Sequence, residues 1–406
     1  MKKQILSFAI GLMGPLSWGQ SVTKTMLRLP DTGQTGSFTA TFGEDNDYTI
    51  NAPYFNLNSA LVATDTVTGL MWQRADGGEM TVENATTYCD TLTLGGYTNW
   101  RLPNAHEAFS IMNLQRSNPS LDILVFTNTG AEYWWSATRQ SNDNTKVWIT
   151  NAGGGIGNHL KTETVSAGGT KKIHVRAVRD VKTPTTLPAR FADNSNNTIT
   201  DNLTGLVWEK MPLATTKTWE EALVYAEGLT LGGQSDWRLP NIKELQSIND
   251  ESMVSPSLNA TYFGSLGVKK YWSSTTLPNQ TTRAWYWDTQ FGITTYDLKT
   301  LANYVLCVRG GGANPISSVE ETRKSKQVQV YPNPASNSLT VSFQNANKVS
   351  RRQVVLVNAL GQLVFKQVLS NLTAVQTIDV SGVAKGSYSV IVTEGNQLST
   401  FNVLIQ

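Results

Sequence analysis

The stretch Trp100-Arg101-Leu102-Pro103-Asn104 occurs a second time as Trp237-Arg238-Leu239-Pro240-Asn241. A proline disfavours helix in the residue before it, so each stretch is expected to be extended as far as the proline. The asparagine that follows is a favoured N-cap residue, and the glutamate three residues later, Glu107 or Glu244, can complete a capping box. The sequence therefore predicts the same loop and the same helix start at two places in the chain.

Other motifs recur around this stretch in the same order. Thr68-Gly69-Leu70-Met71-Trp72 returns as Thr204-Gly205-Leu206-Val207-Trp208. The remaining matched pairs are Leu94-Gly95-Gly96 with Leu231-Gly232-Gly233, Tyr133-Trp134 and Ser136 with Tyr271-Trp272 and Ser274, and Val178-Arg179 with Val308-Arg309. An order kept this closely predicts two tandem copies of one module of about 130 residues. We assign the copies to residues 20–182 and 188–310.

Each copy is predicted to combine helices with a small sheet. A turn leads into a buried strand, and an amphipathic helix then begins at Thr81 or Thr218 and is expected to end at the Gly-Gly pair. A second helix follows Asn104 or Asn241, and the remainder, rich in Trp, Tyr and Thr, is interpreted as short antiparallel strands. This combination predicts an α+β module.

The repeated tryptophans and arginines are expected to have structural roles. Four tryptophans are expected in the core, namely Trp72, Trp100, Trp208 and Trp237. Arg101 and Arg238 are expected to pair with Glu107 and Glu244, or with carbonyl groups, and so to hold the loops that contain Pro103 and Pro240. The alternative is that the two arginines contact a ligand.

The character of the sequence changes at Val328. Short alternating apolar runs, such as Leu339–Phe343 and Tyr388–Val392, are separated by turns from there on. This pattern predicts a small all-β sandwich over residues 328–406. The preceding residues 311–327 are rich in Gly, Ser and Glu and are expected to form a linker.

The N-terminus and the overall charge indicate a compartment and exclude some partners. An apolar run from Ile5 to Leu16 follows two lysines and precedes the small residues Ser17 and Gly19, which is the layout of a signal peptide over residues 1–19. No later stretch reaches about 18 apolar residues, so no membrane span is expected. Lys and Arg number 33 against 31 Asp and Glu, and this balance gives no reason to expect nucleic acid as a partner.

Both copies resemble the DUF1566 module, also known as the Lcl C-terminal domain. The resemblance rests on the Trp-Arg-Leu-Pro-Asn stretch, the Tyr-Trp block, the closing Val-Arg pair, and the segment Leu29–Thr35 ahead of the first copy. It implies two tandem modules of the C-type-lectin-like α+β fold. In adhesin members of the family it is associated with the binding of sulfated polysaccharides, so a polysaccharide or surface glycan is the implied ligand.

The tail resembles the type A sorting domain of the type IX secretion system. The matching residues are Tyr331, Pro332, Asn333, Pro334, Gly361, Gly386 and Tyr388. The resemblance implies the type IX secretion machinery as a partner, and a secreted or outer-membrane surface location reached through the periplasm. The chain departs from the family pattern because it ends in Leu404-Ile405-Gln406 rather than in a basic residue.

The chain has two cysteines, Cys89 in the first copy and Cys307 in the second. Members of the family that the modules resemble often carry both cysteines within one module, but Ala177 and Ala226 stand at the other two positions here. A bond between Cys89 and Cys307 is one expectation for an exported chain. Two buried free thiols in separate cores are the other.

No catalytic or metal-binding signature is present in the sequence. The three histidines are scattered, and neither cysteine has a base near it in the sequence, so no enzyme, metal or cofactor is expected. Ligand contacts are expected on the variable strands, where aromatic rings suit sugars and arginine suits sulfate. The candidates are Trp135, Arg139, Asn142 and Asp143 in the first copy, and Arg283, Tyr286, Trp287 and Asp288 in the second.

These observations favour a secreted or cell-surface binding protein that is not an enzyme. It is expected to be adhesin-like and to recognise an acidic polysaccharide. Two alternatives stay open. One is a structural protein of the cell-surface matrix without a small ligand, and the other is an unrecognised hydrolase, which would need acidic side chains or histidines that converge in a cleft.

Overall fold

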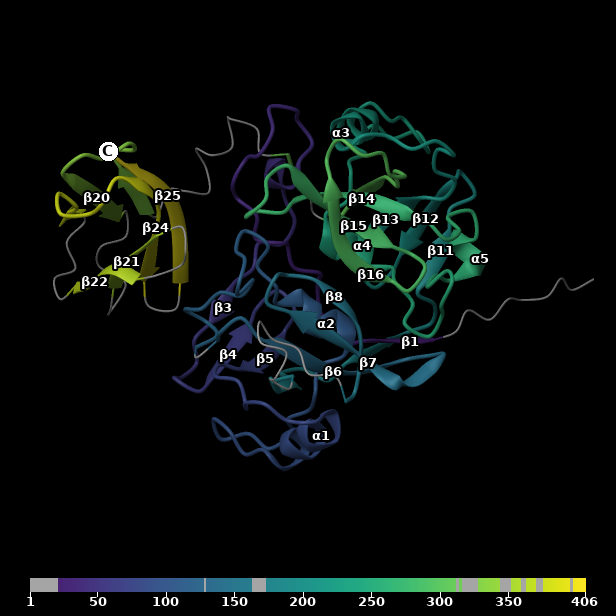
Figure 1. The fold of residues 1–406 in the computed structure, drawn as a ribbon, viewed down its shortest axis with the longest axis horizontal. Helices are drawn as coiled ribbons and strands as arrows, with labels where there is room; N and C mark the ends of the chain where they lie inside the picture. The colour runs from purple at the N-terminus through teal and green to yellow at the C-terminus, as the bar shows by residue number, and fades with distance from the viewer. Residues whose placement is uncertain are drawn as a thin grey trace, which may run out of the picture.

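The computed structural model describes most of the chain, and Figure 1 shows two modules and a further β domain that contains the C-terminus. The described residues are 21–127, 129–162, 173–311, 314–315, 328–343, 352–358, 363–369, 375–394 and 397–406. The expected signal peptide lies outside them, as does the expected linker apart from residues 311 and 314–315. Within the described part of the chain, no helix has the length and apolar character needed to cross a membrane.

The first module contains two antiparallel sheets and two helices. One sheet has the strand order β3-β4-β5-β9, with bounds Phe55–Asn56, Val62–Asp65, Leu70–Gln73 and Val178–Asp180. The other has the order β6-β7-β8, with bounds Tyr133–Gln140, Asp143–Asn151 and Ile156–Leu160. Helices α1 and α2 span Val82–Thr91 and Ala105–Ser110.

The second module repeats this arrangement and has one further short helix among the described residues. Its four-stranded sheet β11-β12-β13-β17 has the bounds Phe191–Asp193, Thr198–Asp201, Leu206–Glu209 and Val308–Gly310. Its three-stranded sheet β14-β15-β16 has the bounds Lys270–Thr276, Arg283–Asp288 and Ile293–Leu298. Helices α3, α4 and α5 span Trp219–Glu227, Ile242–Ser247 and Ala260–Phe263. The tandem repeat in the sequence therefore corresponds to two modules with the same strand order.

The expected α+β class is wrong, because the molecule is mostly β-sheet. Strands make up 38% and helices 11%, and the sheets are several, small and antiparallel. The helices are short: α2 and α4 have six residues each, because loops that contain Asn, Ser and Pro follow them and do not continue the helix. The description of the modules as lectin-like α+β units is therefore withdrawn.

The hydrogen bonds of two serines correct the sequence match between the modules by one residue. Ser136 and Ser273 each donate to the carbonyl of a tryptophan 12 residues later, at 2.8 and 2.7 Å. Trp135, and not Trp134, is therefore the counterpart of Trp272. The sequence match was wrong because the first copy has two adjacent tryptophans, and a slip of one residue in a strand exchanges its two faces.

The repeated loop has the structure that its sequence predicts. Asn241 Oδ1 accepts the backbone N–H of Glu244 at 2.9 Å, and Glu244 Oε2 accepts the backbone N–H of Asn241 at 2.9 Å, which is a complete capping box. Asn104 and Glu107 form the same box in the first module. Each helix start therefore satisfies backbone donors that would otherwise lack partners.

The arginine of each loop holds the capping glutamate from the other side. Arg238 donates to both carboxylate oxygens of Glu244 at 2.6 Å. Arg101 donates to both oxygens of Glu107 at 2.7 and 2.9 Å and also lies 2.9 Å from Asp180. The predicted pairing of these arginines is confirmed, and it ties the extended loop to the first turn of the helix.

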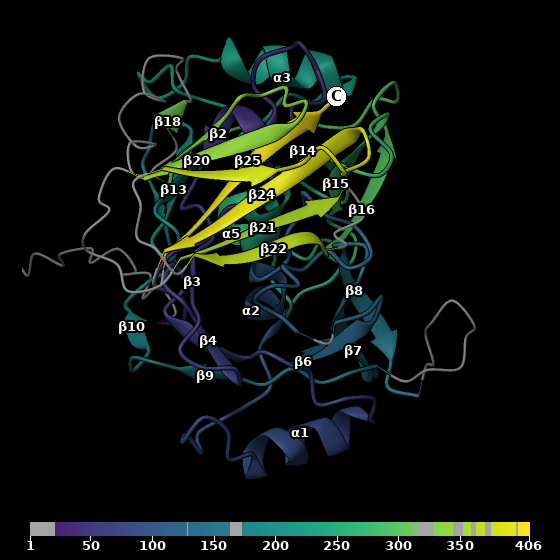
Figure 2. The ribbon, with the colours of Figure 1, turned by 90° about the vertical axis from the view of Figure 1, so that its left-hand side faces the viewer.

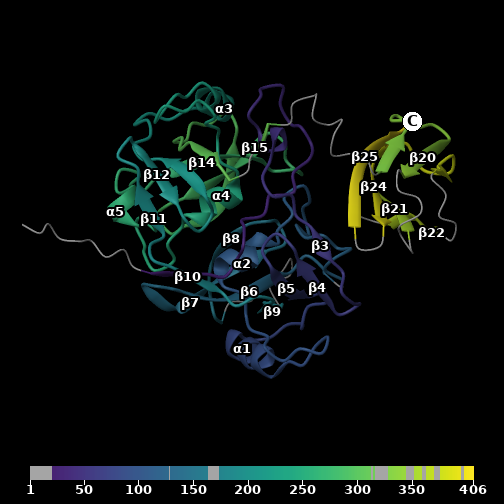
Figure 3. The same ribbon diagram turned by 180° about the vertical axis from the view of Figure 1, so that it is seen from behind.

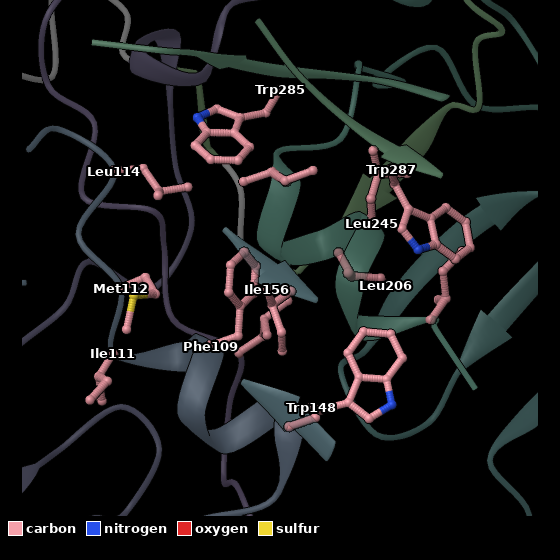
Figure 4. Close-up of a cluster of buried hydrophobic side chains, with 14 of the residues drawn as sticks. Phe109, Ile111, Met112, Leu114, Trp148, Ile156, Leu206, Leu245, Trp285 and Trp287 are labelled. Carbon is pink, nitrogen blue, oxygen red and sulfur yellow. The ribbon is translucent and has the colours of Figure 1, made fainter. Parts of the chain in front are cut away.

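The two modules share a hydrophobic core. Figures 1 and 3 both show α2 and α4 side by side where the modules meet. Phe109 and Ile156 of the first module belong to the same buried cluster as Leu245 and Trp285 of the second (Figure 4). Strands β8 and β16 meet beside it, where the Ile156 backbone N–H donates to Thr294 Oγ1 at 2.9 Å. The modules are therefore joined by a common interior rather than by a linker alone.

Each module also has a smaller core of its own beneath its first helix. Trp100 lies in the cluster under α1, and Trp237 lies in the equivalent cluster under α3. Trp72 and Trp208 lie in the shared core. All four motif tryptophans are at most 3% exposed, so their predicted place in the core is confirmed.

Residues 22–49 lie at the start of the first module, ahead of its first repeated motif, and run along both modules; we call them the segment that precedes the first copy. Strand β1 (Val22–Lys24) pairs with β10 (Thr185–Leu187), and β2 (Tyr48–Thr49) pairs with β18 (Asn314–Pro315). Between them, the short helix η1 (Asp45–Asp47) packs against β14 of the second module. A segment outside the repeat is thus part of the junction between the copies.

The C-terminal residues form two antiparallel sheets around a core of their own, and Figure 2 shows this domain from the front. One sheet, β19-β20-β23, has the bounds Val328–Tyr331, Ser338–Phe343 and Val375–Asp379. The other, β22-β21-β24-β25, has the bounds Leu363–Leu369, Arg352–Asn358, Gly386–Glu394 and Gln397–Ile405. Asn333 of the tail motif accepts the Leu404 backbone N–H at 2.8 Å, and Tyr388 donates to the Ala384 carbonyl at 2.5 Å. Gly361 of the motif lies outside the described residues.

The two arginine–glutamate pairs predict unequal effects of the same substitution. The Arg238 side chain is 2% exposed, and among the described residues Glu244 is the one carboxylate within 4 Å of it. Arg101 is 32% exposed and keeps Asp180 when Glu107 is neutralised. We expect Glu244→Gln to lower the free energy of unfolding by about 3 kcal/mol, because it leaves a buried guanidinium without a counter-charge.

Glu107→Gln is the matched control and is expected to cost about 1 kcal/mol or less. Glutamine keeps the size of glutamate and an oxygen for the capping hydrogen bond, so the difference between the two variants reports the charge. Denaturant-induced unfolding measures both. Equal losses would contradict the role given to the buried pair.

Candidate ligand site between the two modules

Helices α2 and α4 each send one polar side chain across to the other module. His106 and Lys243 occupy the same position, two residues after the capping asparagine. His106 Nε2 lies 2.6 Å from Glu251 Oε1, and Lys243 Nζ donates to the Ser110 carbonyl at 2.7 Å. The modules therefore meet at two counterpart places, which we call the His106 junction and the Lys243 junction.

The Lys243 junction is filled by the segment that precedes the first copy. Besides Ser110, Lys243 Nζ donates to the Asp31 carbonyl at 2.7 Å. Asp45 Oδ2 accepts hydrogen bonds from Thr32 Oγ1 at 2.9 Å and from Thr275 Oγ1 at 2.5 Å. All of these side chains are buried, so the chain places its own carboxylates between its two modules.

Burial has the largest effect on the pKa values at the Lys243 junction. It raises the pKa of Asp31 to about 6, although backbone hydrogen bonds from Ile50 and Thr32 act in the opposite direction. It lowers the pKa of Lys243 to about 8, against the attraction of Asp31 and other carboxylates. It also raises the pKa of Asp45 well above the ordinary value. Burial therefore opposes the charged forms of Asp31 and Lys243, and the attraction between the two groups favours them.

The His106 junction contains a cavity of about 280 Å³ instead of a protein segment. Its wall includes His106 and Thr138 from the first module and Arg190 and Glu251 from the second, and residues 22–26, 28 and 29 close one side. The volume is close to the lower end of the range for small-molecule sites. The junction therefore has room for a group about the size of one sugar ring.

Cationic side chains outnumber acidic ones on the wall of this cavity. Lys24, Arg28 and Arg190 line it, whereas Glu251 is the one carboxylate among the described lining residues. Arg190 donates to the Ser247 carbonyl and lies 3.5 Å from Asp201. Neither Lys24 nor Arg28 has a carboxylate within 4 Å among the described residues. The cavity therefore favours an anionic ligand.

The side chain of Glu251 is already held by neighbouring donors. Oε1 lies 2.6 Å from His106 Nε2 and accepts from Asn249 Nδ2 at 3.1 Å. Burial alone would raise the pKa of Glu251, but the attraction of His106 and these hydrogen bonds outweigh it and hold the pKa below the ordinary value. Glu251 is therefore ionised at neutral pH and positions His106 at the cavity wall.

The eight ligand contacts expected on the variable strands do not form one surface. Trp135, Tyr286 and Trp287 are 1%, 7% and 0% exposed and lie in the hydrophobic clusters, so their rings are not presented to a ligand in solvent. Those three expectations are corrected, and the reason is that both faces of β6 and β15 are covered at these positions.

The other five candidates lie at or near the surface, in two separate hairpins. Arg139 and Asn142 are exposed at the turn from β6 to β7, where Asp143 accepts the Thr145 backbone N–H at 3.0 Å. Arg283 lies over the Tyr296 ring at 5.6 Å, and Asp288 accepts the Gln290 backbone N–H at 2.9 Å. These contacts are local, and the five residues stay predictions as ligand contacts.

The two cysteines are buried free thiols in different cores. Cys89 lies in the cluster under α1 and Cys307 in the cluster under α3. Burial raises the pKa of the Cys89 thiol to about 12 and that of Cys307 well above its ordinary value. The structure therefore agrees with the expectation of two free thiols and not with a disulfide bond between Cys89 and Cys307. Neither sulfur is a candidate nucleophile, because the thiolate is suppressed at both sites.

No group of three or more His, Cys, Asp or Glu side chains is placed to hold a metal ion in the described part of the chain. The site that does emerge was missed by the sequence analysis. One feature of the sequence pointed to it: the repeated motif has histidine at position 106 in the first copy and lysine at the matching position 243 in the second. An ionisable residue on the inner side of a short helix implies a partner beyond that helix.

Comparison with protein-family models matches both modules to the Lcl C-terminal domain, over residues 61–179 and 197–309. The two matches together cover more than half of the chain. Residues 329–406 match the secretion system C-terminal sorting domain. A search of curated proteins finds no match.

Among solved structures, the chain aligns with the crystal structure of dimeric latent PorU from Porphyromonas gingivalis. The alignment has 17% identity and a TM-score of 0.16, and covers 30% of this chain and 12% of that chain. A likeness this weak carries no argument about fold or function.

The buried charges at the Lys243 junction predict a substitution whose cost depends on pH. Lys243→Met leaves two carbonyls without a donor and the Asp31 carboxylate without a counter-charge, and at pH 7.5 we expect a loss of about 3–5 kcal/mol. Burial raises the folded-state pKa of Asp31 above its ordinary value, so ionisation of Asp31 weakens the fold as pH rises through about 6. Removal of Lys243 raises that pKa further, so the loss should be smaller at pH 5 than at pH 7.5.

Denaturant-induced unfolding at the two pH values measures this difference. Lys182→Met, at an exposed position, is the control and should cost little at either pH. A cost for Lys243→Met that is the same at pH 5 and pH 7.5 would contradict the electrostatic attraction between Lys243 and the Asp31 carboxylate.

Proposed function

This chain belongs to the family of the Lcl C-terminal domain, and on that premise we propose that it is a binding protein that recognises acidic polysaccharides at the His106 junction. The proposed role is binding without catalysis, as in an adhesin. The observation that carries the proposal is a cavity between the two modules with an excess of cationic side chains on its wall.

The C-terminal sorting domain indicates export, interaction with the type IX secretion machinery, and a secreted or outer-membrane surface location. A protein at that location meets the glycans of its own surface layer and of neighbouring cells. The family resemblance associates such modules with sulfated polysaccharides, which supports an acidic polymer as the ligand class.

The electrostatics of the cavity also support this ligand class. Lys24 and Arg28 lie on its wall without carboxylate partners among the described residues, and Arg190, which is paired with Asp201, lines it as well. Cations in a concave site attract an anionic polymer over several ångströms, and this attraction weakens as salt is added. Neutral sugars would gain nothing from these charges.

A hydrolase is supported less well by the same cavity. Glycoside hydrolysis by the usual mechanism needs two carboxyl groups that flank the bond to be broken. Glu251 is the one carboxylate among the described residues that line the cavity, and it is already engaged by His106 and Asn249. If no acidic polymer binds, the remaining alternative is a structural protein of the cell-surface matrix without a small ligand.

Equilibrium binding of the full chain to three polymers tests the proposal. Polygalacturonate carries carboxylates, dextran sulfate carries sulfates, and dextran is the neutral control. We expect binding to at least one acidic polymer, no binding to dextran, and at least tenfold weaker binding when NaCl is raised from about 50 to 500 mM. Equal binding to dextran, or no binding to either acidic polymer, would overturn the proposal.

A further inference from the structure

The two junctions offer the same hydroxyl group to whatever lies between the modules. Thr138 and Thr275 are counterparts, each two residues after the serine that bonds a tryptophan carbonyl. Thr138 Oγ1 accepts the Ala105 backbone N–H at 2.9 Å, and Thr275 Oγ1 accepts the Ile242 backbone N–H at 3.1 Å. In both cases the first residue of the short helix fixes the oxygen and leaves the hydroxyl proton to be donated elsewhere.

At the Lys243 junction, that proton goes to a carboxylate. Thr275 donates to Asp45 Oδ2 at 2.5 Å, and Thr32 donates to the same oxygen at 2.9 Å. Asp45 belongs to the segment that precedes the first copy, so it reaches the junction as a separate piece of chain. The Lys243 junction is therefore an occupied carboxylate site in which the protein supplies its own ligand.

At the His106 junction, the same proton has no acceptor among the residues that the structure describes. Thr138 lines the cavity, and no described residue accepts a hydrogen bond from its hydroxyl group. The N-terminal segment passes this junction as strand β1 and contributes lysine and arginine, not aspartate, to the cavity wall. The part of the site that Asp45 fills at one junction is thus open at the other.

The charges around the open junction agree with an anionic occupant. Lys243, a cation, stands at the filled junction, and Lys24, Arg28 and Arg190 surround the open one. The negative charge of Glu251 would repel an anionic ligand, but its carboxylate already contacts His106 and Asn249. Arg190 is likewise paired with Asp201, so Lys24 and Arg28 are the cations on this wall without a carboxylate partner among the described residues, and they leave the balance in favour of an anion.

The filled junction shows which kind of group this site holds. There, a single carboxylate oxygen, Asp45 Oδ2, accepts hydrogen bonds from Thr32 and Thr275, which come from two separate segments. The counterpart group at the open junction is therefore a carboxylate. The cavity of about 280 Å³ leaves space beside the carboxylate for about one sugar ring.

We propose that the His106 junction binds the carboxylate of an acidic sugar, with Thr138 as its hydroxyl donor, in the place that Asp45 occupies at the Lys243 junction. The proposal rests on the proposed function and names the sugar class. Uronic acid residues of a polysaccharide are the ligand, and sulfate groups are not required.

Calorimetric titration of the full chain with a short galacturonate oligomer tests this. The matched ligand is the methyl ester of the same oligomer, which keeps the sugar rings and removes the charge. We expect binding of the acid and at least tenfold weaker binding of the ester, since a hydrogen bond to a charged group is worth about that factor or more.

Two threonine variants locate the site. Thr138→Val keeps the shape of the side chain and is expected to weaken galacturonate binding about tenfold. Thr275→Val makes the same change at the filled junction, so it should lower the melting temperature while leaving the affinity within about twofold. Equal affinities of wild type and Thr138→Val would overturn the proposal.

A second variant covers the case in which Thr138→Val does not fold. Lys24→Ala combined with Arg28→Ala removes two side chains that have no carboxylate partners among the described residues, and should weaken binding by about tenfold. Lys182→Ala combined with Arg116→Ala is the charge-matched control and should leave it unchanged. If the two double variants lose the same binding affinity, the ligand is attracted by net charge alone, and the assignment of the site to the His106 junction is overturned.

The failure of this proposal can be told apart from the failure of the proposed function. If dextran sulfate binds and galacturonate does not, the chain recognises acidic polymers but the carboxylate assignment is wrong. If neither binds, the proposed function itself is wrong.

Discussion

The contact of helix α2 with helix α4 is the constraint on which the rest of the structure depends. Each helix has only six residues, which is too short to be stable alone. A capping box and an arginine–glutamate pair hold each helix start, and the shared core covers the faces that meet. Because neither module encloses that core alone, the two copies form one folded unit.

The duplication creates two counterpart junctions, and the segment before the first copy makes them different. That segment places Asp31 and Asp45 at one junction, where Lys243 donates to the Asp31 carbonyl, and it lines the other junction with Lys24 of strand β1 and with Arg28. One junction thereby becomes structural and the other stays open. The functional difference between two similar modules thus arises from residues outside the repeat.

Much of the local structure could be predicted from the sequence. The repeat, the capping asparagines, the pairing of Arg238 with Glu244 and the buried motif tryptophans follow from patterns only a few residues long. The fold class was wrong because propensity marks where a helix starts, while loops and tertiary packing decide how far it continues. The aromatic candidates were wrong for a related reason, since an aromatic residue in a strand suits a buried face as well as a binding face.

The site itself could not be predicted, because it joins residues that lie far apart in the sequence. His106 and Glu251 are separated by 145 residues, and Asp45 and Thr275 by 230. No periodic pattern records such contacts. The sequence indicated the junctions only by one difference between the copies, which is histidine at position 106 and lysine at the matching position 243.

The most direct measurement is a crystal structure of the full chain with a bound galacturonate oligomer. The filled and open junctions predict that one carboxylate of the oligomer lies within hydrogen-bond distance of Thr138 Oγ1, with its ring in the cavity between the modules, while Asp45 stays on Thr275. An oligomer bound elsewhere, or a carboxylate turned away from Thr138, would contradict the equivalence of the two junctions.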